Sequence, residues 1–304
     1  MTTLDVVLTA SFNEAALEEI LASRDLDARD PHGATALWHA VYFGRAEWVA
    51  RLLDAGAGLD AHDPVAIDRT YGSGHIVSIW RGVSENAPAT PSGRGTLLHV
   101  AAARVGSTEV AARLLDHGVD VNAPDRFGDT ALHIAAFAGN VALIEFLVER
   151  GADVNAVDRV GYSALDHTHL KIEPIRALLR LGASPEGGGR AHSSHHHTDG
   201  SLVSDAAFYD RVDVLDALFE SGAKIKNHPG ALPNAAKHGA TAAVRRLLKA
   251  GADTSATIGW RGRTRPPLEA AAMYASRGCI TALIPHCRDE LDRALETCVE
   301  FSAE

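Results

Sequence analysis

The histidines in the middle of the chain are the residues whose type and spacing most directly suggest chemistry. Six of them fall between positions 167 and 197, namely His167, His169, His192, His195, His196 and His197. Neutral imidazole is a common ligand for divalent transition metals such as zinc. On a regular helix His167 and His169 would point to different faces, whereas in an extended segment they would share one side.

An extended segment at this point would therefore create a metal site. Its predicted ligands are His167, His169, His195 and His197, with Asp166 or Asp199 as a further ligand. The opposite interpretation rests on the surrounding residues, because the run GGGRAHSSHHHTDGS is rich in glycine and serine and such runs are usually solvated. We therefore predict no cofactor, and keep a divalent transition metal as the alternative.

A second chemical feature is a short phrase that occurs twice. Trp80-Arg81-Gly82 and Trp260-Arg261-Gly262 each place an indole beside a guanidinium, a combination enriched at binding hot spots. Arg263 and Arg265 follow the second copy, and such a local positive loop can recognise a carboxylate or a phosphate. The alternative is a coincidence of a three-residue string whose arginines are solvated.

Signatures of known enzyme classes are missing from the sequence. It holds no GxSxG elbow, no phosphate-binding P-loop, no HExxH and no dinucleotide fingerprint. We therefore expect a binding protein rather than an enzyme.

Charge and hydropathy narrow the partners further. The formal net charge of −10 argues against a nucleic-acid or anionic-membrane surface. The sequence contains neither a run of 18 apolar residues nor a recognisable signal peptide. Its 3 cysteines are an odd number without close spacing, which argues against a disulfide framework. We expect a soluble, cytoplasmic protein.

The elements that position these residues are best seen in residues 125–156. Residues 125–128 have turn chemistry, and Thr130 is a predicted N-cap for the helix that follows. Gly139 breaks that helix, a second amphipathic helix follows, and Gly151 is placed as its C-cap. Such a helix pair cannot bury both faces alone, so it needs copies of itself on either side.

The copies recur at a fixed period. Asp158 and Gly161 repeat Asp125 and Gly128 after 33 residues, and Gly118 precedes Gly151 by 33 again. With Thr130-Ala131-Leu132-His133-Ile134-Ala135, the chain resembles the ankyrin-repeat family, whose repeat has this period and a Thr-Pro-Leu-His-x-Ala pattern. The resemblance implies an all-α solenoid in which His99 and His133 are structural.

We expect one ankyrin-repeat domain over residues 1–304, with about six to seven repeats including caps. The caps are placed at residues 1–26 and 279–304. Three long insertions interrupt the array at residues 62–92, 184–201 and 254–265, the first of them with a predicted strand at residues 76–81. All three fall between the second helix of one repeat and the next turn. The resemblance implies that this is the finger side, which borders the concave groove.

Insertions in solenoids map to one face, often the binding face. We therefore predict that the concave groove and the finger-side insertions recognise a protein partner or peptide, with a small anionic ligand as a further option. The predicted contacts are Trp38, His39, Tyr42, Trp80, Arg81, Trp260, Arg261 and Arg263. The alternative is a small-molecule- or metal-binding protein, or an enzyme, with a pocket between residues 62–92 and the inner helices.

Overall fold

The computed structural model describes residues 14–23, 25–29, 34–59, 96–103, 108–125, 127–188, 201–260, 263–287 and 291. In the strands, the side chains of residues 258–260, 263 and 264 are outside this description. The chain divides into two compact units, Met1–Arg159 and Val160–Glu304.

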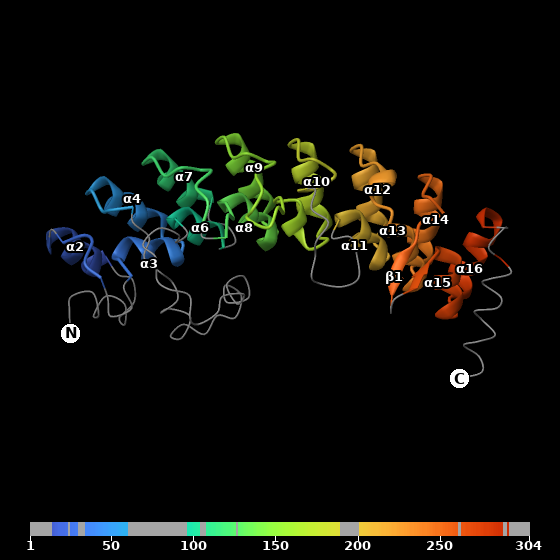
Figure 1. The fold of residues 1–304 in the computed structure, drawn as a ribbon. Coiled ribbons are helices and arrows are strands. Elements are labelled where there is room, and N and C mark those ends of the chain that lie inside the picture. Colours follow the sequence, from blue (N-terminus) through green and yellow to red (C-terminus); the bar gives the residue numbers. More distant parts are fainter. Residues whose placement is uncertain are drawn as a thin grey trace. The chain divides into compact units, whose positions relative to one another are not determined.

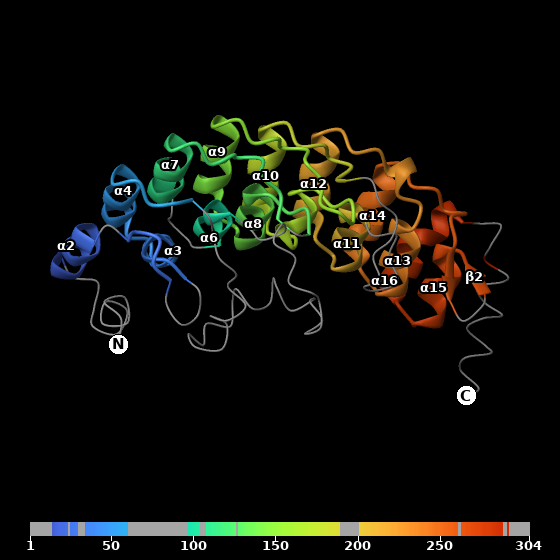
Figure 2. The ribbon, with the colours of Figure 1, turned by 60° about the vertical axis from the view of Figure 1, so that its left-hand side comes forward.

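Unit 1 consists of helix pairs. Its inner helices are α3 (Ala36–Tyr42), α6 (Leu97–Ala102) and α8 (Ala131–Ala138). Its outer helices are α4 (Ala46–Asp54), α7 (Thr108–Asp116) and α9 (Val141–Glu149), and α2 (Glu14–Ser23) precedes them all. Each inner helix contacts the next, as do the outer helices, and Figure 1 and Figure 2 both show these two rows.

Unit 2 repeats the arrangement. Its inner helices are α11 (Leu202–Phe208), α13 (Ala231–Lys237) and α15 (Pro267–Met273), and its outer helices are α10 (Ile172–Arg180), α12 (Val212–Glu220), α14 (Thr241–Lys249) and α16 (Arg277–Leu283). Short 3-10 turns lie at η2 (Asp166–Thr168), η3 (Ile225–Asn227) and η4 (Ile284–His286). The contacts again run from α11 to α13 to α15 and from α10 to α12 to α14 (Figure 1).

The predicted repeat at residues 125–156 forms as expected. Thr130 caps α8, and the helix ends at Gly139, whose φ of 80° is left-handed and therefore suits glycine. The stripe of the outer helix faces inward, since Leu143, Ile144 and Leu147 are fully buried. The all-α solenoid of repeats predicted from the sequence is confirmed within each unit.

The third insertion adds an element that the sequence did not suggest. Residues 254–265, predicted as a loop, contain the antiparallel strands β1 (Ile258–Trp260) and β2 (Arg263–Arg265), with Trp260 opposite Arg263. The insertion at residues 62–92, including its predicted strand, and most of the insertion at residues 184–201 lie outside the described residues. Both caps are described only in part, so their boundaries and the single domain stay predictions.

Candidate binding surface

The histidine of the repeat motif connects successive repeats in unit 1. The Nδ1 atom of His99 accepts a hydrogen bond from the Thr96 backbone N–H at 3.0 Å, so its proton is on Nε2. That Nε2 lies 2.8 Å from the backbone oxygen of Asp129 in the next repeat. Burial lowers the pKa of His99, which keeps the ring neutral. His133 makes the same bond to the Thr130 amide, at 3.1 Å. Both contacts are structural, as the resemblance implied.

Asp166 stands at the position of this histidine in the first repeat of unit 2. Its Oδ2 accepts from the backbone N–H and the hydroxyl of Ser163, both at 2.8 Å. The same oxygen accepts from the Gly188 backbone N–H at 2.8 Å. Asp166 therefore joins the start of its own turn to Gly188. These bonds give Asp166 a structural role that requires no metal.

The two histidines predicted to share a metal differ in their surroundings. His167 lies in η2, with its ring edge-on to Tyr162 at a centroid distance of 6.2 Å. His169 follows with a left-handed φ of 50°, so this segment is not extended as the metal hypothesis requires. Partial burial, with the charges of His167 and Lys171, lowers the pKa of His169.

The remaining predicted ligands, His195, His197 and Asp199, lie outside the described residues. Within either unit taken alone, the described residues hold no group of three metal-ligating side chains close enough to share an ion. The metal site stays a prediction.

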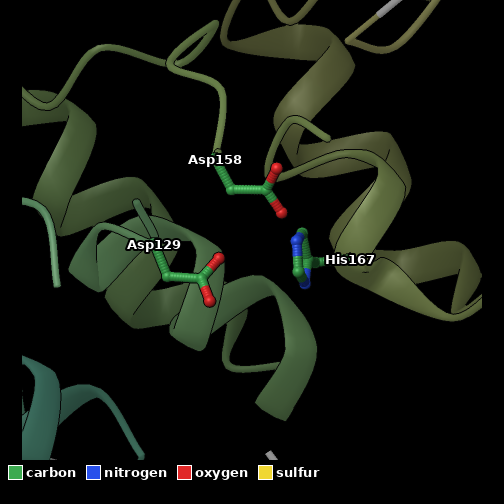
Figure 3. Close-up of side chains that lie close together, drawn as sticks. All are labelled: Asp129, Asp158 and His167. Carbon is green, nitrogen blue, oxygen red and sulfur yellow. The ribbon is translucent and has the colours of Figure 1, made fainter. Parts of the chain in front are cut away.

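Asp129 and Asp158, two aspartates of unit 1, lie close together in the turns of successive repeats. Side-chain oxygens of Asp129 and Asp158 lie within 4.8 Å of one another, and Figure 3 shows the two side chains beside each other. Figure 3 also draws His167, which belongs to unit 2. A backbone hydrogen bond joins the two turns that carry these aspartates, because the Arg159 N–H donates to the Phe127 oxygen at 2.8 Å. A Cβ on Gly128 would lie 2.6 Å from the Arg159 nitrogen, so glycine is required there.

The aromatic residues predicted as groove contacts form a stack on α3. Trp38 and Tyr42 are stacked at 4.9 Å, and Trp38 meets His39 edge-on at 5.2 Å. All three are buried: Trp38 is 2% exposed, His39 is 1% exposed and Tyr42 is 7% exposed. Phe43, which follows them, is the exposed member at 37%. Contact of Trp38, His39 and Tyr42 with a ligand stays a prediction.

Most side chains of the two Trp-Arg-Gly segments and of the arginines that follow the second are not described. Trp80, Arg81 and Arg261 lie outside the described residues, and the side chains of Trp260 and Arg263 are not described. Arg265, at the end of β2, lies 3.5 Å from the Glu269 carboxylate, and both side chains are 13% exposed. Arg265 therefore forms an ion pair within the chain, with Glu269.

An exposed row of rings lies on unit 2 at residues that the sequence reasoning missed. Tyr209, His238 and Tyr274 are the C-cap residues of α11, α13 and α15, and we call these three the aromatic row. Tyr209 is 58% exposed and Tyr274 is 44% exposed, and His238 is also exposed. Each lies eight residues after the N-cap of its helix, as Phe43 does in unit 1, and this shared register is the signal that could have found them.

The row rests on a second layer of side chains. The Phe208 ring lies 4.0 Å from the His238 ring and 4.7 Å from the Tyr209 ring, so it links α11 to α13. Lys237, which precedes His238 in the chain, is also buried, and burial lowers the pKa of its ammonium group. The row is therefore an exposed aromatic surface on a packed base.

Comparison with known families agrees with the repeat geometry. The family model "Ankyrin repeats (3 copies)" matches residues 71–158, and the model "Ankyrin repeat" matches residues 32–64. The chain is an ankyrin-repeat protein. Its fold is similar to the crystal structure of the ankyrin repeat domain of Bcl-3, a member of the IkappaB protein family. That likeness has a TM-score of 0.60 at 24% identity and covers 83% of this chain and 98% of the other.

Curated relatives of this ankyrin-repeat protein are much longer. The neurogenic locus notch homolog protein 1 of Xenopus tropicalis is 34% identical over 119 residues, which cover 37% of this chain and 5% of the relative. The neurogenic locus Notch protein of Drosophila melanogaster is 31% identical over 137 residues, covering 44% and 4%. The chain thus spans about a twentieth of their length. Among the described residues, no helix is long and apolar enough to cross a membrane.

Proposed function

We propose that this ankyrin-repeat protein is a binding module that recognises a protein partner or peptide through its groove and finger side. Ankyrin repeats generally mediate protein–protein interaction, and each repeat adds to one extended surface. The proposal rests on one observation, the aromatic row of Tyr209, His238 and Tyr274 on three successive inner helices of unit 2.

Exposed aromatic side chains at the same register of successive repeats indicate a surface that binds a partner. A tyrosine offers a large apolar face, a polar tip and few rotatable bonds, which is why tyrosine is enriched at interface hot spots. The six exposed large hydrophobic residues of the described part are Phe43, Val157, Val160, Tyr209, Tyr274 and Ile284. All three aromatic ones are C-caps of inner helices.

The residues that the sequence predicts as ligand contacts fit into this proposal as secondary contacts. The finger-side insertions would add specificity around the row, and Trp38, His39 and Tyr42 would contact the ligand only if their stack opened, since all are buried. We also propose the cytoplasm as the compartment, because Cys279 is a buried thiol that forms no disulfide.

The test is panning of a random-peptide display library on the purified full chain. Peptides that bind should lose about tenfold in affinity with Tyr209→Ala or Tyr274→Ala, which corresponds to a loss of about 1.4 kcal/mol. Ile284→Ala is the matched control, because Ile284 is an exposed apolar residue of the same unit at 37% exposure and lies off the row. Peptides that bind all three variants equally well would contradict the proposal.

A further inference from the structure

The carboxamide of Asn234 is a buried polar group on α13, one of the helices that carry the aromatic row. Asn234 is 1% exposed, and neither its Nδ2 nor its Oδ1 has a hydrogen-bond partner among the residues that the structure describes. We infer that this carboxamide forms hydrogen bonds with the main chain of the bound peptide. This inference rests on the proposed function and adds the chemistry by which the partner is held.

The fold does not require a polar residue at this position. Asn234 is the fourth residue after the N-cap of its helix, and the residues at that register of α8 and α15 are Ile134 and Ala270. Ile134 is 4% exposed and Ala270 is 1% exposed, so apolar side chains fill this place in other repeats. A buried polar group without a hydrogen bond costs free energy that an apolar side chain avoids. Asn234 therefore lowers the stability of its repeat, which is typical of a residue kept for function.

Asn234 lies on the same face of α13 as the member of the aromatic row on that helix. The His238 backbone N–H donates to the Asn234 backbone oxygen at 3.1 Å, so the two residues are one helical turn apart. A peptide that lies across the exposed rings therefore passes within one helical turn of the Asn234 carboxamide. Because the carboxamide is covered, binding has to move the side chains over it, and such rotamer changes are common when proteins bind their partners.

The donor and acceptor atoms of the carboxamide select another amide. Nδ2 carries two N–H donors and Oδ1 is an acceptor. An ionised carboxylate offers acceptors alone and would leave Oδ1 unpaired, whereas an ammonium group offers donors alone and would leave Nδ2 unpaired. A peptide main chain offers an N–H and a C=O at almost every residue, so it can satisfy both atoms. These groups are available in an extended segment, whereas in the middle of an α-helix they bond to one another. The partner is therefore extended where it meets Asn234.

Two buried asparagines allow a matched comparison of stability. Asn234→Leu removes the unpaired amide and keeps a branched side chain of similar shape, so it should raise the midpoint of thermal unfolding by about 2 °C or more. Asn140→Leu is the control and should lower the midpoint, because the Oδ1 of Asn140 accepts from the Leu143 N–H at 3.1 Å and caps α9. Asn234→Ala, with the side chain that α15 has at this register, avoids overpacking. A lower midpoint for both Asn234 variants would show that the amide is satisfied within the fold, as by an ordered water, and would overturn the inference.

The binding experiment uses a fluorescein-labelled peptide selected from the display library and measures its affinity for the full chain by fluorescence anisotropy. Copies of this peptide each carry one N-methylated main-chain amide, which removes a single N–H donor. We expect Asn234→Ala to bind the parent peptide about tenfold more weakly than the wild type does, while Asn140→Leu binds it unchanged. One methylated copy should lose about tenfold in affinity for the wild type and none for Asn234→Ala, because the bond that methylation removes is already missing from that variant.

The outcomes separate this inference from the proposed function. If every methylated copy loses the same affinity for the wild type and for Asn234→Ala, no main-chain N–H bonds to Asn234 and the inference is wrong. The proposed function survives that result as long as the parent peptide still depends on Tyr209 and Tyr274. A parent peptide whose affinity is unchanged by both tyrosine substitutions would remove the aromatic row as a binding surface, and the inference with it.

Discussion

The imidazole Nε2 of His99 donates a hydrogen bond to the backbone oxygen of Asp129, 2.8 Å away in the following repeat. The same ring accepts the Thr96 amide on its other nitrogen, so one neutral imidazole joins the start of its own helix to the next finger. In unit 2, Asp166 makes the equivalent pair of bonds as an acceptor on both sides, from Ser163 and Gly188. His99 donates its second bond to the backbone oxygen of Asp129, whereas Asp166 accepts its second bond from the backbone N–H of Gly188.

The first prediction concerns the pH dependence of His99. Burial lowers its pKa in the folded state, so the unfolded chain binds more protons once the pH falls below the usual value of 6.5. Stability should therefore decline as the pH falls from about 7.5 towards 5.5. Denaturant titrations at both pH values measure this, and His99→Gln, which cannot titrate, should show a smaller decline. An identical decline in both proteins would contradict this role of His99.

The second prediction concerns Asp166. Asp166→Ala leaves the Ser163 and Gly188 amides without their acceptor, which should lower the free energy of unfolding by about 2 kcal/mol or more. Asp166→Asn keeps a side-chain oxygen as acceptor and should cost less. Thermal and denaturant unfolding measure both variants. An Asp166→Ala protein as stable as the wild type would show that these bonds contribute little.

The third prediction concerns Glu186. Burial raises its pKa, but hydrogen bonds from the Lys224 backbone and from Asn227, with the nearby His228, outweigh this and lower the pKa below its usual 4.5. A depressed folded-state pKa means that the carboxylate stabilises the fold above about pH 4.5 and that this contribution is lost as the pH falls through the folded value.

The measurement compares wild type with Glu186→Gln by denaturant unfolding. The wild type should be more stable at pH 7, and the difference should shrink as the pH falls below 4.5, the usual value for this carboxyl. A difference that stays constant with pH would assign the effect to packing rather than to the charge of Glu186.

The repeat could be predicted from the sequence because its signals are local and repeated. Thr130, Gly139 and the stripe at Leu143 and Ile144 each follow from capping, turn and burial rules, and they form as predicted. The structural role of Asp166 was not foreseen, because its second bond joins residues 22 positions apart and reverses the usual polarity of the contact.

The candidate site was harder to predict than the fold. The sequence drew attention to unusual residues such as Trp38 and His39, which are buried in their own stack. It overlooked Tyr209 and Tyr274, because their repeats have lost the Thr-x-Leu-His pattern that would have aligned them. Exposure at a shared register emerges only after the helices are placed.

Photo-cross-linking tests the central claim most directly. A benzoyl-phenylalanine placed at position 209, 274 or 284 replaces an exposed side chain of unit 2 without disturbing its core. With a peptide selected from the library, the account predicts cross-links from positions 209 and 274 and none from position 284. Cross-links from position 284 alone, or from none of the three, would contradict binding at the aromatic row.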